Sequence, residues 1–304
     1  MTVIRPHCCY TLSVKHTKLN VEGATMKSVL VTGASKGIGF ETALAFARAG
    51  YRVHATMRNP AASPLLAKLA AEHSLPITVT AVDVDDDASV ASGFAAIQSQ
   101  HGPIDVLVNN AGVEAMGSIE ELPMSDFRAV METNYFGALR CIKAVIPHMR
   151  ARGHGAILNV SSVAGSFSQP PTSPYSASKW ALEAMCEGLA AEMKAFGVRV
   201  VLIQPGIIDT SMAQRISKLE SPLYPHAARI AGFFSATLAD KPAQPSLVAQ
   251  LMVDVANSES AQLRYVVGPG ANEILALRNS MSDEEWVALN AADDATFQRL
   301  MAGG

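Results

Sequence analysis

Residues 29–39 read VLVTGASKGIG, a short apolar run followed by a glycine-rich turn and the start of a helical pattern. The glycines at positions 33, 37 and 39 are spaced G-x-x-x-G-x-G. Glycine allows a tight turn and a close approach of backbone to phosphate, and the N-terminus of the next helix supplies N–H groups and the positive end of its dipole. The stretch therefore predicts a strand, a nucleotide-binding turn and a helix. A Walker-type phosphate loop fits less well, because no Gly-Lys-Ser or Gly-Lys-Thr closes the motif.

The rest of the chain continues this alternation of apolar runs and helical stretches. We expect strands at 29–31, 51–56, 77–82, 104–108, 156–160, 198–203 and 265–268, and helices at 38–49, 64–73, 88–100, 125–150, 176–195 and 245–256. The alternation predicts parallel strands joined by helical crossovers. Continuous apolar strands predict that both faces of the sheet are covered. The predicted fold class is α/β, a single doubly wound Rossmann domain with a mostly parallel seven-stranded sheet and helices on both faces.

The chain divides into three parts of different character. Residues 26–270 carry the alternation and are predicted to form the domain, with an irregular helical segment at about 211–240. Residues 1–25 have neither clear periodicity nor an apolar signal region. For them we expect a disordered leader or the product of an upstream start site, with an organellar targeting signal as the alternative. Residues 271–304 are expected to add a helical C-terminal extension, to which the sequence assigns no role.

Composition argues against several classes of function. Of 304 residues 49% are hydrophobic, the net charge is −3 and no block of basic residues is present. Nucleic-acid binding therefore has no electrostatic support. The four cysteines and eight histidines show neither metal-ligand spacing nor a disulfide framework, which predicts no metal site and a reducing, cytoplasmic location. No apolar run reaches the ~18 residues that a membrane span requires.

Tyr175 and Lys179 form the most informative pair of side chains. Their i, i+4 spacing puts them on one face of a helix. At ~4 Å and an effective dielectric of ~20, a cation favours a phenolate by about 4 kcal/mol, which lowers the phenol pKa by about three. Burial of the lysine opposes part of this effect. The pair predicts a tyrosine that exchanges protons near neutral pH, as a general acid/base must; an ordinary start of an amphipathic helix is the alternative.

Arg58 lies where the second strand ends, about 20 residues after the glycine turn. Sites for NAD usually have a carboxylate there that binds the ribose hydroxyls. A guanidinium instead suits a 2′-phosphate, which a carboxylate would repel. Lys36 in the glycine turn could add positive charge. The pattern favours NADP over NAD, with a solvated loop arginine as the alternative.

These residues, with several others in order, resemble the short-chain dehydrogenase/reductase family over about residues 27–268. The matching motifs are Thr32 to Gly39, Asp83-Val84, Asn109-Asn110-Ala111-Gly112, Asn134, Ser161-Ser162, Tyr175 with Lys179, and Pro205-Gly206 with Thr210. The texture around 162–179 and after the second strand is most similar to members that act on hydroxysteroids or retinol. The resemblance implies hydride transfer between a nicotinamide and an alcohol or carbonyl carbon.

The resemblance also implies roles for four catalytic residues. Tyr175 would donate the proton during reduction, and Ser162 would hold the substrate oxygen. Ser162 is preferred to Ser161 because its thirteen-residue step to Tyr175 matches the family. Lys179 would lower the Tyr175 pKa and bind the nicotinamide ribose. Asn134 would anchor a water that passes protons to Lys179; a polar residue on an exposed helix face is the alternative.

The cofactor-binding prediction joins the glycine turn to positions carried over from the family. It comprises Gly33, Ser35, Lys36, Gly37, Ile38, Gly39, Arg58, Asp83, Val84, Asn110, Gly112, Tyr175, Lys179, Pro205, Gly206, Ile208 and Thr210. Two of these residues have a structural alternative. Asp83 could instead cap the next helix, and Thr210 could cap the helix that follows it.

The resemblance places a substrate lid at 211–240. Its Leu223, Tyr224, Phe233 and Phe234 suggest an apolar small-molecule substrate that is steroid-, retinoid- or acyl-like, although they could simply pack the lid on the domain. The predicted function is an NADP(H)-dependent oxidoreductase that interconverts a ketone or aldehyde and an alcohol. A non-catalytic NADP-binding sensor is the alternative. The family implies a homodimer or homotetramer formed through the helices within 128–149 and 181–194.

Overall fold

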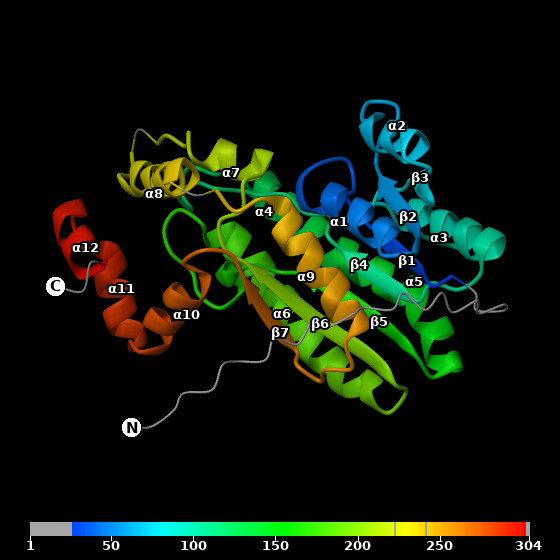
Figure 1. Ribbon diagram of the computed structural model, residues 1–304. Coiled ribbons are helices and arrows are strands. Elements are labelled where there is room, and N and C mark those ends of the chain that lie inside the picture. The colour runs from blue at the N-terminus through cyan, green and yellow to red at the C-terminus, as the bar shows by residue number, and fades with distance from the viewer. Residues whose placement is uncertain (1–25, 222, 241, 302–304) are drawn as a thin grey trace, which may run out of the picture.

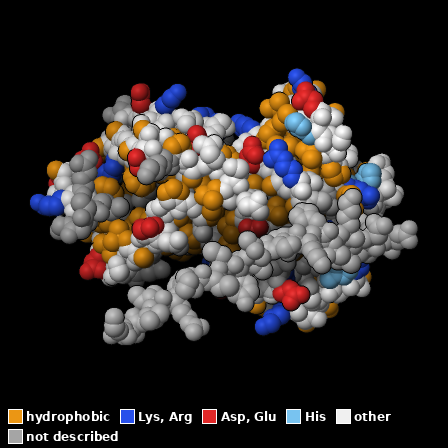
Figure 2. Space-filling model, in the orientation of Figure 1, with side chains coloured by type: hydrophobic (Ala, Val, Ile, Leu, Met, Phe, Trp, Pro, Cys, Tyr) orange, Lys and Arg blue, Asp and Glu red, His pale blue; other side chains and the backbone are white. Residues whose placement is uncertain are grey.

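The computed structural model describes residues 26–221, 223–240 and 242–301 (Figure 1). The predicted leader at 1–25 lies outside the described residues. In the part of the chain that is described, no helix combines the length and the apolar character that a membrane crossing requires. On the face drawn in Figure 2, acidic and basic side chains are interspersed among apolar ones.

A seven-stranded sheet forms the centre of the molecule (Figure 1). Its strands are β1 (Ser28–Val31), β2 (Arg52–Met57), β3 (Ile77–Ala81), β4 (Val106–Asn109), β5 (Gly155–Val160), β6 (Val198–Pro205) and β7 (Arg264–Val267). Their order is β3-β2-β1-β4-β5-β6-β7, and every neighbouring pair is parallel. The predicted doubly wound α/β fold is confirmed, and its sheet is fully parallel.

Helices cover both faces of this sheet. The helices of the described residues, including those that lie beyond the sheet, are α1 (Gly37–Arg48), α2 (Leu65–Glu72), α3 (Asp87–His101), α4 (Met124–Met131), α5 (Ala138–Arg152), α6 (Ser173–Lys194), α7 (Ser211–Ile216), α8 (His226–Asp240), α9 (Pro245–Asn257), α10 (Ala271–Asn279), α11 (Asp283–Ala291) and α12 (Asp294–Met301). One buried cluster joins the sheet to α1 and α9, for example through Phe46 and Met252. A second joins it to α3, α5 and α6 through residues such as Phe94 and Leu182. The two clusters account for strands that are apolar on both faces.

The single helix predicted over 125–150 is interrupted. A π-helical turn, η1 (Glu132–Gly137), separates α4 from α5. Gly137 lies so close to Val84 that a Cβ there would be 2.9 Å from a valine methyl carbon. The π-helical turn is a short interruption within one long helical stretch, and the sequence analysis did not detect it. Such turns occur frequently at functional sites.

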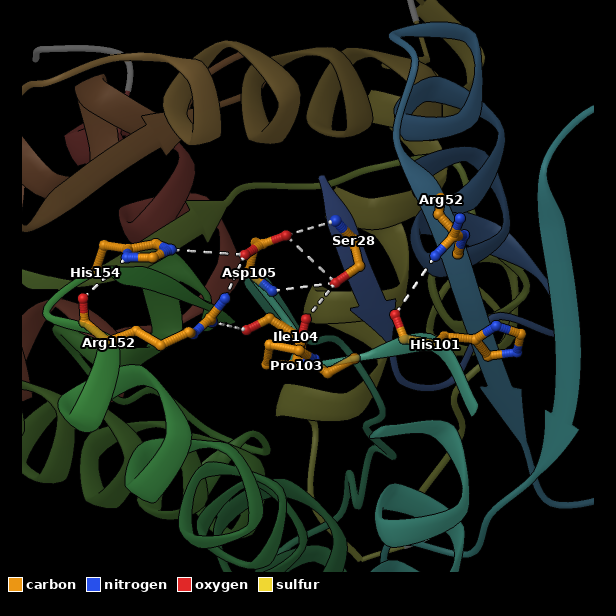
Figure 3. A network of polar contacts seen from close by, with 8 residues as sticks. All are labelled: Ser28, Arg52, His101, Pro103, Ile104, Asp105, Arg152 and His154. Carbon is orange, nitrogen blue, oxygen red and sulfur yellow. Dashed lines mark hydrogen bonds and ion pairs between the residues drawn. The ribbon is translucent and has the colours of Figure 1, made fainter. Parts of the chain in front are cut away.

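The amino ends of the strands are joined by a polar network (Figure 3). Asp105, just before β4, accepts hydrogen bonds from the backbone N–H of Ser28 at 2.8 Å and from Arg152 Nη1 at 2.8 Å. Arg152 Nη2 also donates to the Ile104 carbonyl at 2.7 Å. These contacts fix the start of β1 against the start of β4 and the end of α5. The opposite, carboxyl edge of the sheet is therefore the edge available for a site.

That carboxyl edge has a crevice where the strand order reverses. From β1 the chain runs outward through β2 and β3 on one side and through β4 to β7 on the other. In open α/β sheets ligands bind at this switch point, outside the carboxyl ends of the strands. The loops after β1, β2, β3, β4, β5 and β6 all open toward it, and these loops carry almost every site residue predicted from the sequence.

Candidate active site

A cavity of about 1040 Å³ lies at the carboxyl edge of the sheet. Of the predicted site residues it is lined by Gly33, Ser35, Lys36, Gly37, Ile38, Arg58, Asp83, Val84, Asn110, Gly112, Ser162, Tyr175, Lys179, Pro205, Gly206, Ile208 and Thr210. Gly39 and Asn134 are not among the lining residues and lie behind the wall. The fold thus brings residues from six loops and α6 into one space.

The glycine turn after β1 leaves room for a ligand and for a neighbouring loop. Gly33 has φ +67°, and a Cβ there would lie 2.7 Å from the Cα of Ala111. A side chain at Gly39 would come within 2.3 Å of Asn110 Nδ2 and 2.6 Å of the Gly33 carbonyl oxygen. Gly33 therefore permits the turn, and Gly39 permits α1 to pack under it. Gly39 was predicted as a cofactor contact, and the structure gives it this packing role.

Asn110 points its side chain at the glycine turn. Its Nδ2 donates to the carbonyls of Thr32 at 2.9 Å and Gly33 at 3.2 Å. In return, Thr32 Oγ1 accepts from the backbone N–H groups of Asn110 and Ala111, both at 3.0 Å. The β1 and β4 loops are thereby fixed to each other, and the backbone of 110–112 forms the cavity wall.

Tyr175 and Ser162 both line the cavity. Tyr175 comes from the first turn of α6, and Ser162 follows β5. Ser162 Oγ donates to the Pro205 carbonyl at 3.5 Å and accepts from the Ala164 N–H at 3.2 Å. The nearby Ser162 hydroxyl lowers the pKa of Tyr175, but desolvation by the surrounding protein is the larger influence and Glu114 adds a like charge. Together they raise the pKa of Tyr175 to about 12. The sequence analysis expected a lowered pKa for Tyr175, and the surrounding protein shifts it in the opposite direction.

The contacts of Lys179 explain why it does not lower the pKa of Tyr175. It is 5% exposed, and its Nζ donates to the Val160 carbonyl at 2.9 Å. The Nζ atom lies 5.6 Å from the centroid of the Tyr175 ring. Burial lowers the pKa of Lys179 to about 8, although the nearby charge of Glu183 raises it. The i, i+4 spacing does put both side chains on one face of α6, but the ammonium is directed to a strand carbonyl and is itself desolvated.

Asn134 is a buried anchor in η1 and is 2% exposed. Its Nδ2 donates to the Val113 carbonyl at 3.0 Å and to Ser178 Oγ at 2.9 Å, and its Oδ1 accepts from the Val113 N–H at 2.9 Å. The alternative of an exposed helix face is wrong. Both amide protons are in use, so the side chain connects the β4 loop to α6 instead of presenting donors to the cavity.

Replacing Asn134 with Ala should destabilise the fold by about 1–3 kcal/mol, because Val113 and Ser178 would lose buried hydrogen-bond partners. Urea unfolding at matched m-values measures this change. Asn279→Ala, at an exposed position at the end of α10, is the control and should stay within about 0.5 kcal/mol of wild type. Equal stability of the two variants would contradict the anchor role.

Near the ends of β2 and β3 the cavity is lined by side chains of both charges. Arg58 is exposed just after β2 and lines the cavity with Lys36. Asp85, which the sequence analysis missed, also lines it; its Oδ2 accepts from Thr133 Oγ1 at 2.9 Å, and its buried Oδ1 has no partner. Burial raises the pKa of Asp85, and the nearby Arg58 lowers it. The adjacent aspartates at 83 and 85–87 gave no sequence signal for singling out this one.

The two capping alternatives have different outcomes. The cap of α3 is Asp86, whose side chain accepts from the Ser89 N–H, so Asp83 does not cap that helix. Asp83 Oδ1 accepts instead from the Asp85 N–H at 3.1 Å. Thr210 does cap α7, accepting from the Ala213 N–H at 3.3 Å, and it also lines the cavity.

Residues of the predicted lid and of the C-terminal helices also line the cavity. Of the lid residues proposed from the sequence, Phe233 and Phe234 line it. Leu223 and Tyr224 do not: Leu223 is 66% exposed, and the Tyr224 hydroxyl donates to Glu120 at 2.6 Å. The cavity is also lined by residues that belong to no sequence motif and were not predicted: Glu114, Phe167, Gln169, Arg215, Arg229, Ile274 and Phe297.

The residues present fit a nicotinamide dinucleotide. Gly33 and Gly37 form a cradle in which both backbones have positive φ, at the N-terminus of α1. Two cations, Lys36 and Arg58, stand at the same end of the cavity. Tyr175, Ser162 and Gly112 line the same cavity. A phosphate-containing ligand and a carbonyl compound would thus meet suitable groups within one cavity.

Comparison with known proteins agrees with this geometry. A family model described as short chain dehydrogenase matches residues 27–221. The chain is 36% identical over 273 residues to YusZ, an uncharacterized oxidoreductase of Bacillus subtilis, with coverage of 86% of this chain and 96% of that protein. It is 39% identical over 204 residues to retinol dehydrogenase 8 of Bos taurus, covering 64% of this chain and 65% of that protein. Actinorhodin polyketide ketoreductase with NADPH superposes with a TM-score of 0.74 at 29% identity, over 81% of this chain and 97% of that chain.

Proposed function

The chain belongs to the short-chain dehydrogenase/reductase family of oxidoreductases, and on that premise we propose that it interconverts a carbonyl compound and an alcohol with NADP(H). The observation that carries the proposal is that Tyr175 and Ser162 line one cavity together with the glycine cradle at the N-terminus of α1. Tyr175 is the general acid/base, and the substrate oxygen lies between its hydroxyl and that of Ser162.

The two hydroxyls have distinct tasks. The bound cofactor supplies or accepts the hydride. During reduction the substrate oxygen gains negative charge, Tyr175 donates its proton to that oxygen, and Ser162 stabilises the oxygen with a second hydrogen bond. A phenol with a raised pKa is protonated at neutral pH, so Tyr175 carries the proton that reduction needs.

Lys179 acts on the tyrosine after proton transfer. The phenolate left behind is half-buried, and a cation on the same helix face stabilises it. With a pKa of about 8, Lys179 is mostly protonated at pH 7 and loses this charge in mildly alkaline solution. Asn134 supports the site indirectly through Val113 and Ser178.

NADP is the proposed cofactor, and Arg58 with Lys36 supports it because both cations border the cavity at the end of β2 and in the glycine turn. The NADPH complex of the ketoreductase that shares this fold adds support. Replacing Arg58 with Ala should weaken NADPH binding by about 10- to 100-fold, the loss of one charge-assisted hydrogen bond of about 1.5–3 kcal/mol. NADH binding should change by less than about threefold.

Fluorescence titration of both nucleotides measures this shift in preference. Arg128→Ala, on α4 and away from the cavity lining, serves as the control. If Arg58→Ala weakened NADPH and NADH binding equally, the assignment of Arg58 to the 2′-phosphate would be wrong.

An NADPH-consumption screen tests the proposed function directly. Its panel contains ketosteroids, retinal, 3-oxoacyl esters and simple aldehydes. We expect turnover with at least one apolar carbonyl class, because Phe167, Phe233 and Phe234 line the region beyond Tyr175. Tight NADPH binding without turnover of any compound would favour the alternative, a non-catalytic NADP-binding sensor.

A further inference from the structure

Arg229 connects the lid helix α8 to the C-terminal helices. Its Nε donates to Asp294 Oδ1 at 2.7 Å, its Nη2 to the Ala292 carbonyl at 2.6 Å and its Nη1 to the Asn290 carbonyl at 3.1 Å. The side chain is only 12% exposed. One guanidinium thus uses three of its nitrogens on the turn between α11 and α12, a fork geometry that lysine cannot reproduce.

The same guanidinium stands over an aromatic ring of α12. The carbon at its centre is 4.5 Å from the centroid of Phe297. Arg229 and Phe297 both line the cavity, as does Ile274 from α10. The contact between lid and extension is therefore part of the cavity wall. Figure 1 shows α8 and α10–α12 gathered at the end of the molecule remote from β3.

A second connection joins the extension to the loop after β5. Trp286 is 6% exposed and donates its indole N–H to the Ser168 carbonyl at 2.8 Å. Its ring meets the edge of Phe167 with centroids 5.3 Å apart. Phe167, Trp286 and Leu289 form a separate small hydrophobic cluster, against which Ile274 and Phe297 pack. The loop that carries Ser162 is thus supported from outside by α11.

The lining of this one cavity comes from two groups of elements, which we call its near zone and its far zone. The near zone contains Ser162, Tyr175 and the phosphate cradle. The far zone is bounded by Phe233 of the lid, Phe297 and Ile274 of the extension, and Phe167. At the far wall, Arg229 forms an ion pair with Asp294 and donates hydrogen bonds to two backbone carbonyls. A ligand that fits both zones has a polar, reactive end and an apolar tail.

We propose that α10–α12 form the distal wall of the substrate cavity, that Arg229 fastens this wall to the lid, and that Phe297 sets the greatest length of apolar tail the site accepts. This inference rests on the proposed function, since it concerns the substrate of that same site. Phe297 and Arg229 are specificity-determining and positioning residues, respectively, and neither takes part in proton transfer.

A series of straight-chain 2-ketones of increasing length tests the proposal. Wild-type kcat/KM should rise with length and then fall once the tail reaches Phe297. Phe297→Ala should move the maximum to longer ketones and raise kcat/KM for the longest ones by about tenfold, because two or more additional CH₂ groups at about 0.8 kcal/mol each become buried. Short ketones should change by less than about twofold, since they do not reach the far zone.

Matched variants separate this effect from a general loss of packing. Val287→Ala removes an apolar side chain of α11 that is 65% exposed, and its length profile should equal that of wild type. Arg229→Lys keeps the charge but loses the fork, and its profile should broaden, with the decline at long tails weakened by about threefold or more. Thermal unfolding of each variant identifies any that fail to fold, and Ile274→Ala replaces Phe297→Ala in that case.

A measurement without turnover distinguishes this inference from the proposed function. Trp286 is one of two tryptophans in the sequence, so Trp180→Phe leaves it as the single reporter of the distal wall. Long-chain ketones should then change its fluorescence saturably, whereas the shortest ketones should not. Turnover with identical profiles for Phe297→Ala and Val287→Ala, or fluorescence indifferent to long ketones, would overturn the distal wall. Absence of turnover with a fluorescence response would instead overturn the proposed function alone.

Discussion

Replacing Tyr175 with Phe is expected to lower kcat/KM by about 10²- to 10⁴-fold, the usual contribution of a positioned general acid, while NADPH still binds. The substitution removes one oxygen and leaves the ring, so the cavity keeps its shape. Without the phenol the substrate oxygen retains Ser162 as a hydrogen-bond donor but has no group that delivers a proton. We therefore expect kcat/KM to fall by this amount while the affinity for NADPH is unchanged. NADPH oxidation measures the first quantity, and nucleotide fluorescence titration measures the second.

Tyr224→Phe is the control for this prediction. Its hydroxyl contacts Glu120 at the surface and not the cavity, so turnover should remain within about twofold of wild type. The pH dependence has a definite sign as well: reduction uses the protonated phenol and should not require low pH, whereas oxidation requires the phenolate and should accelerate as pH rises. Turnover by Tyr175→Phe at the wild-type rate would remove Tyr175 from the mechanism.

Replacing Gly39 with Ala is expected to lose about 1–3 kcal/mol of stability, the usual range for overpacking a tight interior, and to weaken nucleotide binding. The added Cβ would be 2.3 Å from Asn110 Nδ2 and 2.6 Å from the Gly33 carbonyl oxygen. Asn110 has little freedom to withdraw, because its Nδ2 is bonded to Thr32 and Gly33. Either the β4 loop or the phosphate cradle must shift.

Gly188→Ala provides a matched control. Gly188 lies within α6, and a Cβ there meets nothing within 4 Å. Alanine should stabilise the helix by about 0.5–1 kcal/mol. Urea unfolding gives both changes in stability, and NADPH titration gives the change in affinity. If Gly39→Ala were as stable as wild type and bound nucleotide as tightly, the proposal that close packing of the two loops requires a glycine at position 39 would be wrong.

The fold was predictable because local signals agreed with one another. The apolar run at 29–31, the glycines after it and the helix that follows specify one βα unit, and the later units repeat its pattern. The gathering of Ser162, Tyr175, Arg58 and the glycine turn then follows from topology, since carboxyl ends of parallel strands meet at one edge. A family resemblance supplied the order of these motifs but not their contacts.

The side-chain contacts of the site and their effects on pKa could not be predicted, because residue spacing does not specify where the polar atoms of a side chain lie. Spacing put Lys179 beside Tyr175 but could not show that its ammonium binds Val160, nor that burial would dominate the Tyr175 pKa. The π turn around Asn134 and the surface position of Leu223 were likewise invisible. Arg229 and Phe297 belong to no motif, and their contact depends on the 67 intervening residues folding back on the lid.

Deuterium transfer tests the central claim most directly. NADPH carrying deuterium at the transferable position of its nicotinamide ring is incubated with the protein and an apolar ketone, and the product alcohol is examined by mass spectrometry. The account predicts one deuterium on the carbon that bears the new hydroxyl, and an amount of labelled alcohol that falls by about 10²- to 10⁴-fold with Tyr175→Phe. Nucleotide bound at saturation with no deuterium in any alcohol, across the whole panel of carbonyl compounds, would contradict it.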